Sequence, residues 1–471
     1  MKTRSNWFVF LIAGVLMLLA ACGNDGDTKT EGDSVTLTMW NRYPELNQPF
    51  EAFIAGFEEE HSDITIELQN IPLASNTAQY QTAISENSLP DIFTTQPSLD
   101  ELVELDLVKD LNEIFPEEVK DEFFPGTWFE GGTTLNDNVY VLPMFSPNHG
   151  VNMLYYNKNV LEEYGIAESD IPQTWDEMMT VGKQINEASN GSVYGFMWSN
   201  VDWANAGFVH MMATAISPNT PWKFDFKEGE PSFATEGNVE SIEFLKQMYD
   251  EGVMHPMSIE VDTTKAEANF AAGKAAFYIS GNWTGTNLIE GSDFEEWGVV
   301  DLPTQDGKPW YYMNARQADG LMVNNNTEHW EEVKVFLEYA KEHLYSEVIL
   351  ATGTTQPAKM DVEGELPFPQ FEDILDLMTE RAIPVPKPTE RTLEIVDFET
   401  ELFSRLGWND IGEVAVGYMT ESIDDIEVEL NNLNEEANEV FNELLEEFSD
   451  VSKETYQFPD WEPFTPYEGA E

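Results

Sequence analysis

Cysteine and basic residues are scarce in this chain. Its 471 residues include one Cys and 23 Lys plus Arg, against 88 Asp plus Glu, and the formal net charge is −65. A single Cys permits no intramolecular disulfide and no thiolate metal cage, and the six His show no metal-binding spacing such as HExxH. Nucleic acids and anionic lipid surfaces are bound through clustered Lys and Arg. We therefore expect no metal, no cofactor and no nucleic-acid partner.

Sequence signatures of catalysis are missing as well. The chain contains no G-x-S-x-G, no P-loop and no G-x-G-x-x-G motif. Carboxylates are so abundant that no pair stands out as the acid and nucleophile of a glycosidase, which lie ~5 to 9.5 Å apart. We expect a protein that is not an enzyme. A secreted carbohydrate-active enzyme stays as a less favoured alternative.

Aromatic residues are plentiful, which separates this chain from disordered acidic chains. The sequence is 42% hydrophobic and 12% aromatic, whereas acidic disorder goes with few aromatics. At ~150 residues per domain, the length predicts two or three domains. The excess negative charge destabilises a compact state unless counterions screen it, with a Debye length of ~3 Å at 1 M salt. We expect adaptation to concentrated salt, to alkaline pH or to both.

The N-terminus carries the features of an export signal. Lys2 and Arg4 precede an apolar run over residues 7–19, which is shorter than the ~20 residues of a spanning helix. The sequence Leu-Ala-Ala-Cys ending at Cys22 resembles the bacterial lipobox, and this resemblance implies cleavage before Cys22 and lipid attachment to it. We predict a signal peptide over 1–21, a lipidated tether over 22–34, and a protein anchored by lipid at the extracytoplasmic face of the cell membrane.

From residue 35 onward, short strands alternate with helices, which favours α/β units. We expect strands over 35–40, 64–68, 91–95, 195–198 and 275–280, and helices over 49–60, 79–85 and 239–249. Residues 421–450 hold 12 acids and no Lys or Arg, with apolar residues three and four apart. This pattern predicts an amphipathic helix or a pair of helices, and Ser422, followed by Asp425, is the expected N-terminal cap.

Aromatic and polar residues gather where the expected strands end. In open α/β sheets, ligands bind beyond the carboxyl ends of the strands. A flat ring offers an apolar face to a sugar, and Asn, Asp and Arg hydrogen-bond its hydroxyls. Core packing is the alternative role for each Trp, and a structural ion pair is the alternative for Arg42 and Arg316. The candidates of this kind are Trp40, Asn41, Arg42, Tyr43, Trp198, Asp202, Trp203, Asn282, Trp283, Asn314 and Arg316.

Several loose motifs occur in a fixed order along the chain. They are VTLTMW at 35–40, LPDIF at 89–93, LYYNK at 154–158, PQTWDE at 172–177, FAAGKAA at 270–276 with GNW at 281–283, and GVVDLP at 298–303. In this order they resemble the sugar-type extracellular solute-binding proteins (family 1) of ABC importers, similar to maltose-binding protein. The resemblance implies an α/β, two-lobed, periplasmic-binding-protein-like fold of type II, with a ligand cleft between lobes that closes by hinge motion.

The resemblance also implies where the chain crosses between lobes and which residues meet the ligand. Crossings are expected near 147–151, 299–303 and 353–357, with lobe 1 at 35–147 plus 300–352 and lobe 2 at 148–299 plus 353–471. Trp283 matches the family's sugar-stacking Trp, and Trp40 and Asn41 match the turn after the first strand. Two further ligand contacts, Asn148 and His149, fall at the first crossing, and Trp408 loosely matches an aromatic in the last helical region.

The implied function is a monomeric, lipid-anchored receptor that captures a carbohydrate, expected to be an oligosaccharide, and delivers it to an ABC permease. The stretch 314–319 departs from the glycine-rich form usual in the family, which leaves the ligand class open. A uronate-bearing sugar or another non-sugar solute is therefore an alternative ligand, read by Arg42 and Arg316. An adhesion or cell-surface structural protein is a further alternative.

Overall fold

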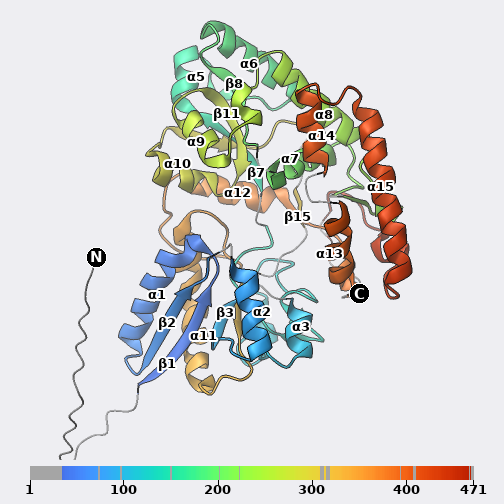
Figure 1. Cartoon of the computed structure of the whole chain (residues 1–471). Coiled ribbons are helices and arrows are strands. Elements are labelled where there is room, and N and C mark those ends of the chain that lie inside the picture. The colour runs from blue at the N-terminus through green and yellow to red at the C-terminus, as the bar shows by residue number, and fades with distance from the viewer. Residues whose placement is uncertain are drawn as a thin grey trace, which may run out of the picture.

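The structure is a computed structural model that describes residues 34–72, 75–95, 98–148, 151–200, 202–221, 223–307, 312–314, 319–392, 394–406, 410–465 and 467. Two α/β bodies, each built around one main sheet, lie one above the other in Figure 1. We call the body that holds the first strand the first lobe and the other body the second lobe. Among the described residues, no helix combines the length and the apolar character that crossing a bilayer requires.

The first lobe has a five-stranded sheet in the order β2-β1-β3-β14-β6. β1 runs parallel to β2 and β3, whereas β14 runs antiparallel to β3 and β6. Leu37 and Met39 point into one core with aromatic residues of α1, while Phe93 packs in a second core with Tyr80 of α2. The elements are β1 (Val35–Asn41), α1 (Asn47–Glu60), β2 (Ile64–Asn70), α2 (Asn76–Glu86), β3 (Ile92–Thr94), β6 (Leu142–Pro143), β14 (Gly320–Val323) and α11 (Trp330–Leu344).

The second lobe has a four-stranded sheet in the order β12-β7-β11-β8. Its central strand β11 is buried along all seven residues, because helices cover both faces and leave no polar side to alternate with. Phe277 joins the core under α6 and α8, and Tyr278 joins the core under α9, α10 and α12. The elements are β7 (Asn152–Asn157), α6 (Trp175–Ala188), β8 (Tyr194–Met197), α7 (Asp202–Thr214), α8 (Glu236–Asp250), α9 (Thr263–Ala271), β11 (Ala275–Gly281), α10 (Thr284–Ser292), β12 (Trp297–Val300) and α12 (Phe371–Arg381). The expected strands and helices of both lobes are confirmed.

Three helices near the C-terminus, α13 (Ile395–Leu406), α14 (Asp410–Met419) and α15 (Ile426–Glu447), extend the second lobe. α14 and α15 lie beside α8 on one flank of that lobe (Figure 1). α13 and α15 share an aromatic-rich core with a short hairpin of β9 (Phe224–Asp225) and β10 (Glu230–Pro231). The predicted amphipathic segment is therefore one helix, held by its apolar stripe.

The expected cap of this helix was wrong. Asp425, in extended conformation, caps α15 by accepting a hydrogen bond from the Val428 amide at 3.1 Å. Ser422 instead donates its hydroxyl to the Gly417 carbonyl at 3.0 Å, which closes the end of α14. Both residues belong to the short connection between two helices, and the sequence pattern did not distinguish the end of one from the start of the next.

Replacing Asp425 by alanine is expected to lower the free energy of unfolding by about 1 kcal/mol, because one N-terminal amide of α15 loses its acceptor. Asp424→Ala is the matched control, since Asp424 is an exposed neighbour of equal charge. Urea unfolding of both variants measures the difference. Equal stabilities for the two variants would contradict the assigned cap.

The chain passes between the lobes three times. The first and third passages run side by side, with hydrogen bonds from the Ser146 amide to the Gln356 carbonyl and from the Ala358 amide to the Met144 carbonyl, both 2.9 Å. The third passage stays bonded to the first lobe as far as Met360, whose amide donates to the Glu122 carbonyl at 2.8 Å. It therefore extends beyond the expected 353–357.

The second passage comes later than the expected 299–303. Val299 and Val300 still belong to β12, and the Thr304 amide donates to the Gln173 carbonyl at 3.1 Å. The Trp175 indole nitrogen also donates a hydrogen bond to the Pro303 carbonyl at 3.1 Å. These contacts tie the segment to the second lobe, so the chain leaves that lobe only after Thr304.

Candidate functional site

Two of the predicted tryptophans come together in the second lobe. β8 and β11 are parallel neighbours, with Met197 opposite Tyr278, so the residues that follow them emerge at the same edge of the sheet. Trp198 and Trp283 line one small hollow there, of about 30 Å³, together with Asn152, Ser199, Phe208, Thr263, Ile279, Ser280 and Gly281. A hollow of this size holds a water molecule rather than a sugar ring. A larger ligand would therefore lie across its mouth.

Trp198 forms the buried wall of this hollow. The residue is 2% exposed, and its ring packs edge to face against the Phe208 ring, with centroids 5.3 Å apart. The indole Nε1 has no hydrogen-bond partner among the described residues. A buried donor without an acceptor costs about 1 to 3 kcal/mol, so a ligand hydroxyl or a water that reaches Nε1 is stabilised.

Trp283 is placed by the glycine two residues before it. A Cβ atom added to Gly281 would lie 2.2 Å from the Trp283 ring, so the half-buried indole folds back over the end of β11 only because that position is glycine. The Tyr155 hydroxyl donates to the Gly281 carbonyl at 2.9 Å, which anchors the start of the turn. In the motif Gly-Asn-Trp, the glycine therefore makes room for the tryptophan ring at the end of the strand.

Asn282 connects this turn to the third passage between the lobes. The residue is 3% exposed, and its side-chain amide nitrogen donates to the Thr354 carbonyl. The Asn282 Oδ1 atom has no partner among the described residues. This hydrogen bond joins the segment that carries Trp283 to the third passage.

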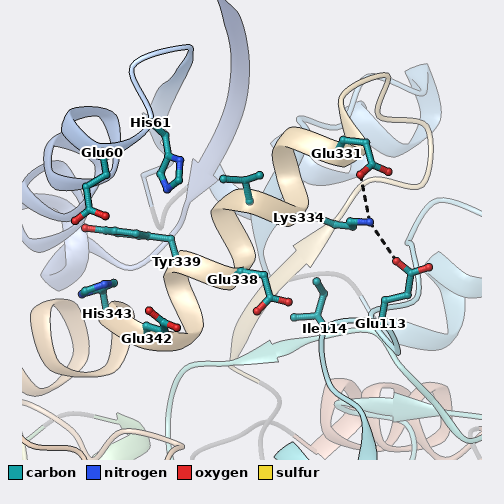
Figure 2. A pocket seen from close by; sticks show the side chains of 11 residues that line it. Glu60, His61, Glu113, Ile114, Glu331, Lys334, Glu338, Tyr339, Glu342 and His343 are labelled. Carbon is teal, nitrogen blue, oxygen red and sulfur yellow. Dashed lines mark hydrogen bonds and ion pairs between the residues drawn. The ribbon is translucent and has the colours of Figure 1, made fainter.

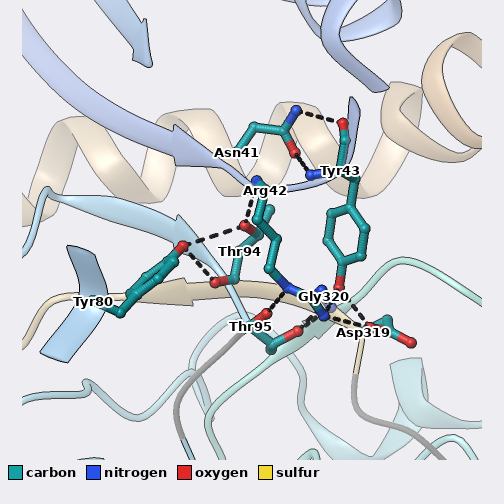
Figure 3. Close-up of polar contacts among 8 residues, drawn as sticks. All are labelled: Asn41, Arg42, Tyr43, Tyr80, Thr94, Thr95, Asp319 and Gly320. Carbon is teal, nitrogen blue, oxygen red and sulfur yellow. Dashed lines mark hydrogen bonds and ion pairs between the residues drawn. The ribbon is translucent and has the colours of Figure 1, made fainter. Parts of the chain in front are cut away.

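In the first lobe, Arg42 and Tyr43 form a charged cluster with Asp319 (Figure 3). The Tyr43 hydroxyl lies 2.5 Å from Asp319 Oδ1, and Arg42 Nη2 lies 3.1 Å from the same oxygen. Arg42 Nη2 also donates to the Tyr43 hydroxyl at 2.8 Å, and Arg42 Nε donates to the Thr95 carbonyl. The structural ion pair that was the alternative for Arg42 is thus present. Burial and the neighbouring Asp319 charge raise the pKa of Tyr43 well above its usual range, so the phenol stays neutral.

The side chains of Asn41 and Trp40 make their contacts with other residues of the first lobe. The fully buried Asn41 donates from Nδ2 to the Tyr43 carbonyl and to Asn47 Oδ1, both at 2.9 Å, and accepts from the Tyr43 amide at 3.0 Å. Half-buried Trp40 packs edge to face against Tyr80, with ring centroids 5.4 Å apart. These contacts favour a role in shaping the turn that presents Arg42 and Tyr43.

Asn148 lies in the first passage and contacts the third. Its Nδ2 atom is 3.4 Å from Gln356 Oε1, and Gln356 Nε2 donates to Thr379 Oγ1 of α12 at 2.7 Å. This chain of side chains joins both passages to the second lobe. Sequence reasoning missed Gln356 and Asp319, because both lie far along the chain from their partners, by 208 and 277 positions.

The remaining candidates are not placed by side-chain contacts. His149, Arg316 and Trp408 lie outside the described residues. Asp202 and Trp203 begin α7, and Asn314 ends β13 (Tyr312–Asn314), which pairs with β15 (Ala382–Pro384), but the side chains of these three are not described. They stay predictions.

A larger hollow lies elsewhere, between the end of α1 and α11 in the first lobe (Figure 2). It measures about 560 Å³, and five of its eleven lining residues are glutamates. Lys334 pairs there with Glu331 at 3.3 Å and with Glu113 at 3.4 Å. It contains none of the predicted site residues. Among the described residues, no group of three His, Cys, Asp or Glu is arranged to hold a metal ion. We assign no function to this hollow.

Comparison with known proteins agrees with the fold. Residues 43–343 match the model of a family described as bacterial extracellular solute-binding protein. The melibiose/raffinose/stachyose-binding protein MelE of Bacillus subtilis (strain 168) is 24% identical over 310 residues, covering 63% of this chain and 67% of that protein. The multiple sugar-binding protein of Streptococcus mutans is 21% identical over 338 residues, covering 69% and 75%. The structure of the sugar-binding protein MalE from Xanthomonas citri superposes with a TM-score of 0.62 at 18% identity, covering 89% of this chain and all of that one. The predicted two-lobed α/β fold is confirmed.

Proposed function

Because the chain belongs to the bacterial extracellular solute-binding protein family, we propose that it captures an oligosaccharide and delivers it to an ABC permease. The observation that carries the proposal is the pair Trp198 and Trp283, which the ends of two parallel strands bring to one hollow. Aromatic faces suit the C–H face of a sugar ring. The names of the two sequence relatives, which bind melibiose, raffinose and stachyose or multiple sugars, support the same ligand class.

In this proposal the protein binds without catalysis and closes by hinge motion. The ligand would lie between the hollow of the second lobe and the Arg42 cluster of the first lobe, and the three passages between lobes would act as the hinge. The division of the chain into two lobes is part of the proposal, with the return boundaries moved to after Thr304 and after Met360. We also propose a monomer that is anchored through lipid on Cys22 and exposed at the extracytoplasmic face.

A binding screen tests the ligand class. The protein from residue 23 onward, in about 2 M salt to screen its charge, is melted with neutral and uronate-bearing mono- and oligosaccharides. A ligand present at ~100 times Kd should add about 2.7 kcal/mol of stability. Chromatography of the recovered sugar checks that it is unaltered. No thermal shift across the panel would overturn the carbohydrate assignment, and cleaved sugar would favour the enzyme alternative.

The proposed anchor has its own test. Expression of the full chain and of Cys22→Ser in a bacterial host should place the first in the membrane fraction and release the second. Metabolic labelling with a fatty acid should mark the first protein alone. Labelling of neither protein would contradict the lipidation of Cys22.

A further inference from the structure

Arg42 is the cation that a negatively charged sugar would be expected to use, yet its charge is already matched. Its side chain is 21% exposed and that of Asp319 is 10% exposed, and the two form an ion pair at 3.1 Å. Two opposite charges this close, both shielded from water, are screened little by salt. The neutral phenol of Tyr43 lies between them, so these three side chains together carry no net charge.

The geometry of the guanidinium reinforces this neutralisation. An arginine binds a carboxylate best through two parallel N–H groups. Here Nε donates to the Thr95 carbonyl, and Nη2 donates to Tyr43 and faces Asp319. Arg42 Cζ also lies 4.2 Å from the centroid of the Tyr43 ring. One full edge of the guanidinium is therefore occupied by groups of the first lobe itself.

We propose that Asp319 is a specificity-determining residue, which neutralises Arg42 and makes the site select neutral sugars over uronate-bearing sugars. This inference rests on the proposed carbohydrate-binding function. A carboxylate that approaches the cluster meets the Asp319 charge beside Arg42, in a chain whose formal net charge is −65, and gains no uncompensated cation from the pair. A hydroxyl group at the same place meets donors and acceptors without that repulsion.

The test uses pairs of ligands that differ in one group. A neutral oligosaccharide identified in the screen and its counterpart with C6 oxidised to a carboxylate are titrated by calorimetry, in about 2 M and about 0.2 M salt. The wild-type protein should bind the neutral sugar at least about tenfold more tightly. Asp319→Asn keeps the shape and the acceptor oxygen but removes the negative charge that pairs with Arg42. It should lower this ratio at least about tenfold.

Three further variants isolate the charge at this position. Glu113→Gln removes one negative charge from an exposed ion pair of the first lobe, so it should leave the ratio unchanged. The double variant Arg42→Gln with Asp319→Asn should restore the wild-type ratio. Asp319→Ser removes the same charge with a smaller polar side chain and should lower the ratio in the same direction, which keeps the proposal testable if Asp319→Asn does not fold.

The outcomes separate this inference from the function on which it rests. If neutral sugars bind but the wild-type protein accepts the uronate equally well, or Asp319→Asn leaves the ratio unchanged, the role of Asp319 is overturned and carbohydrate binding stands. If neither member of any pair binds the wild-type protein, carbohydrate binding itself is overturned, and the inference with it.

Discussion

Trp283→Ala is expected to weaken sugar binding at least about 30-fold, equivalent to about 2 kcal/mol, while the protein still folds. The indole is half-buried and lies against Gly281 at the rim of the hollow, rather than in the middle of either core of the second lobe. Its removal therefore takes away a stacking surface without opening a large internal cavity. Calorimetric titration with the sugar found in the screen measures the loss.

Trp330→Ala is the matched control for this substitution. Trp330 is also half-buried, but it begins α11 in the first lobe, where Lys109 lies 4.7 Å from its ring centroid. The control removes a comparable aromatic surface far from the hollow, and its Kd should stay at the wild-type value. If both variants bind like the wild-type protein, Trp283 does not stack on the ligand.

Gly281→Ala tests the position of the Trp283 ring without removing the ring. The added methyl group would lie 2.2 Å from the Trp283 ring, so the indole has to move from its place over the strand end. We expect a loss of sugar affinity of at least about tenfold, with near-native thermal stability. Binding at wild-type strength would show that the observed position of the ring is not the one the ligand requires.

The elements of both lobes were predictable because their signals are local. Val35 to Asn41 alternates in burial, as a strand with one buried face does, and the Phe residues of α1 recur at helical spacing. That Trp198 and Trp283 lie at the same edge of one sheet was also predictable. Each follows a strand of the same α/β sheet, and parallel neighbours end at one edge.

What the sequence did not reveal depends on contacts between distant segments. Asp319 stands out in no motif, and only the pairing of β14 beside β3 brings it to Arg42. Asn41 was expected to face ligand, but its amide is taken up by Tyr43 and Asn47. The second passage between lobes was expected at positions too near the N-terminus. The hydrogen bond from Trp175 to the Pro303 carbonyl joins residues far apart in the sequence, so no local pattern predicts it.

Glu267→Gln is expected to stabilise the protein at neutral and alkaline pH. Glu267 lies on α9, is 5% exposed, and accepts a hydrogen bond from Asn287 Nδ2 of α10 at 3.1 Å. Burial raises the pKa of its carboxyl group from 4.5 to about 7, against the opposing effect of the hydrogen bonds. The nearby hydroxyl groups of Tyr155 and Tyr278 are themselves buried, and their pKa values are raised by burial, so both stay neutral.

The sign of the pH effect follows from proton binding. Between pH 4.5 and about 7 the folded protein keeps a proton on Glu267 that the unfolded chain has lost. The free energy of unfolding therefore falls as pH rises through this range, by at most about 3 kcal/mol for this one group. Above this range the contribution of Glu267 no longer changes with pH. Glutamine has the same shape, still accepts from Asn287, and has no charge to bury.

The experiment compares unfolding free energies of the wild-type protein and of Glu267→Gln at about pH 5 and about pH 8, in about 2 M salt. The salt matters because it screens the self-repulsion of a chain that carries a formal net charge of −65. Glu290→Gln corrects for that, since Glu290 is exposed on α10 and its replacement changes net charge equally. A gain at pH 8 for Glu267→Gln alone would show that a buried carboxylate weakens the contact of α9 with α10, the helix that starts directly after Trp283. Equal gains for both variants would assign the effect to surface charge instead.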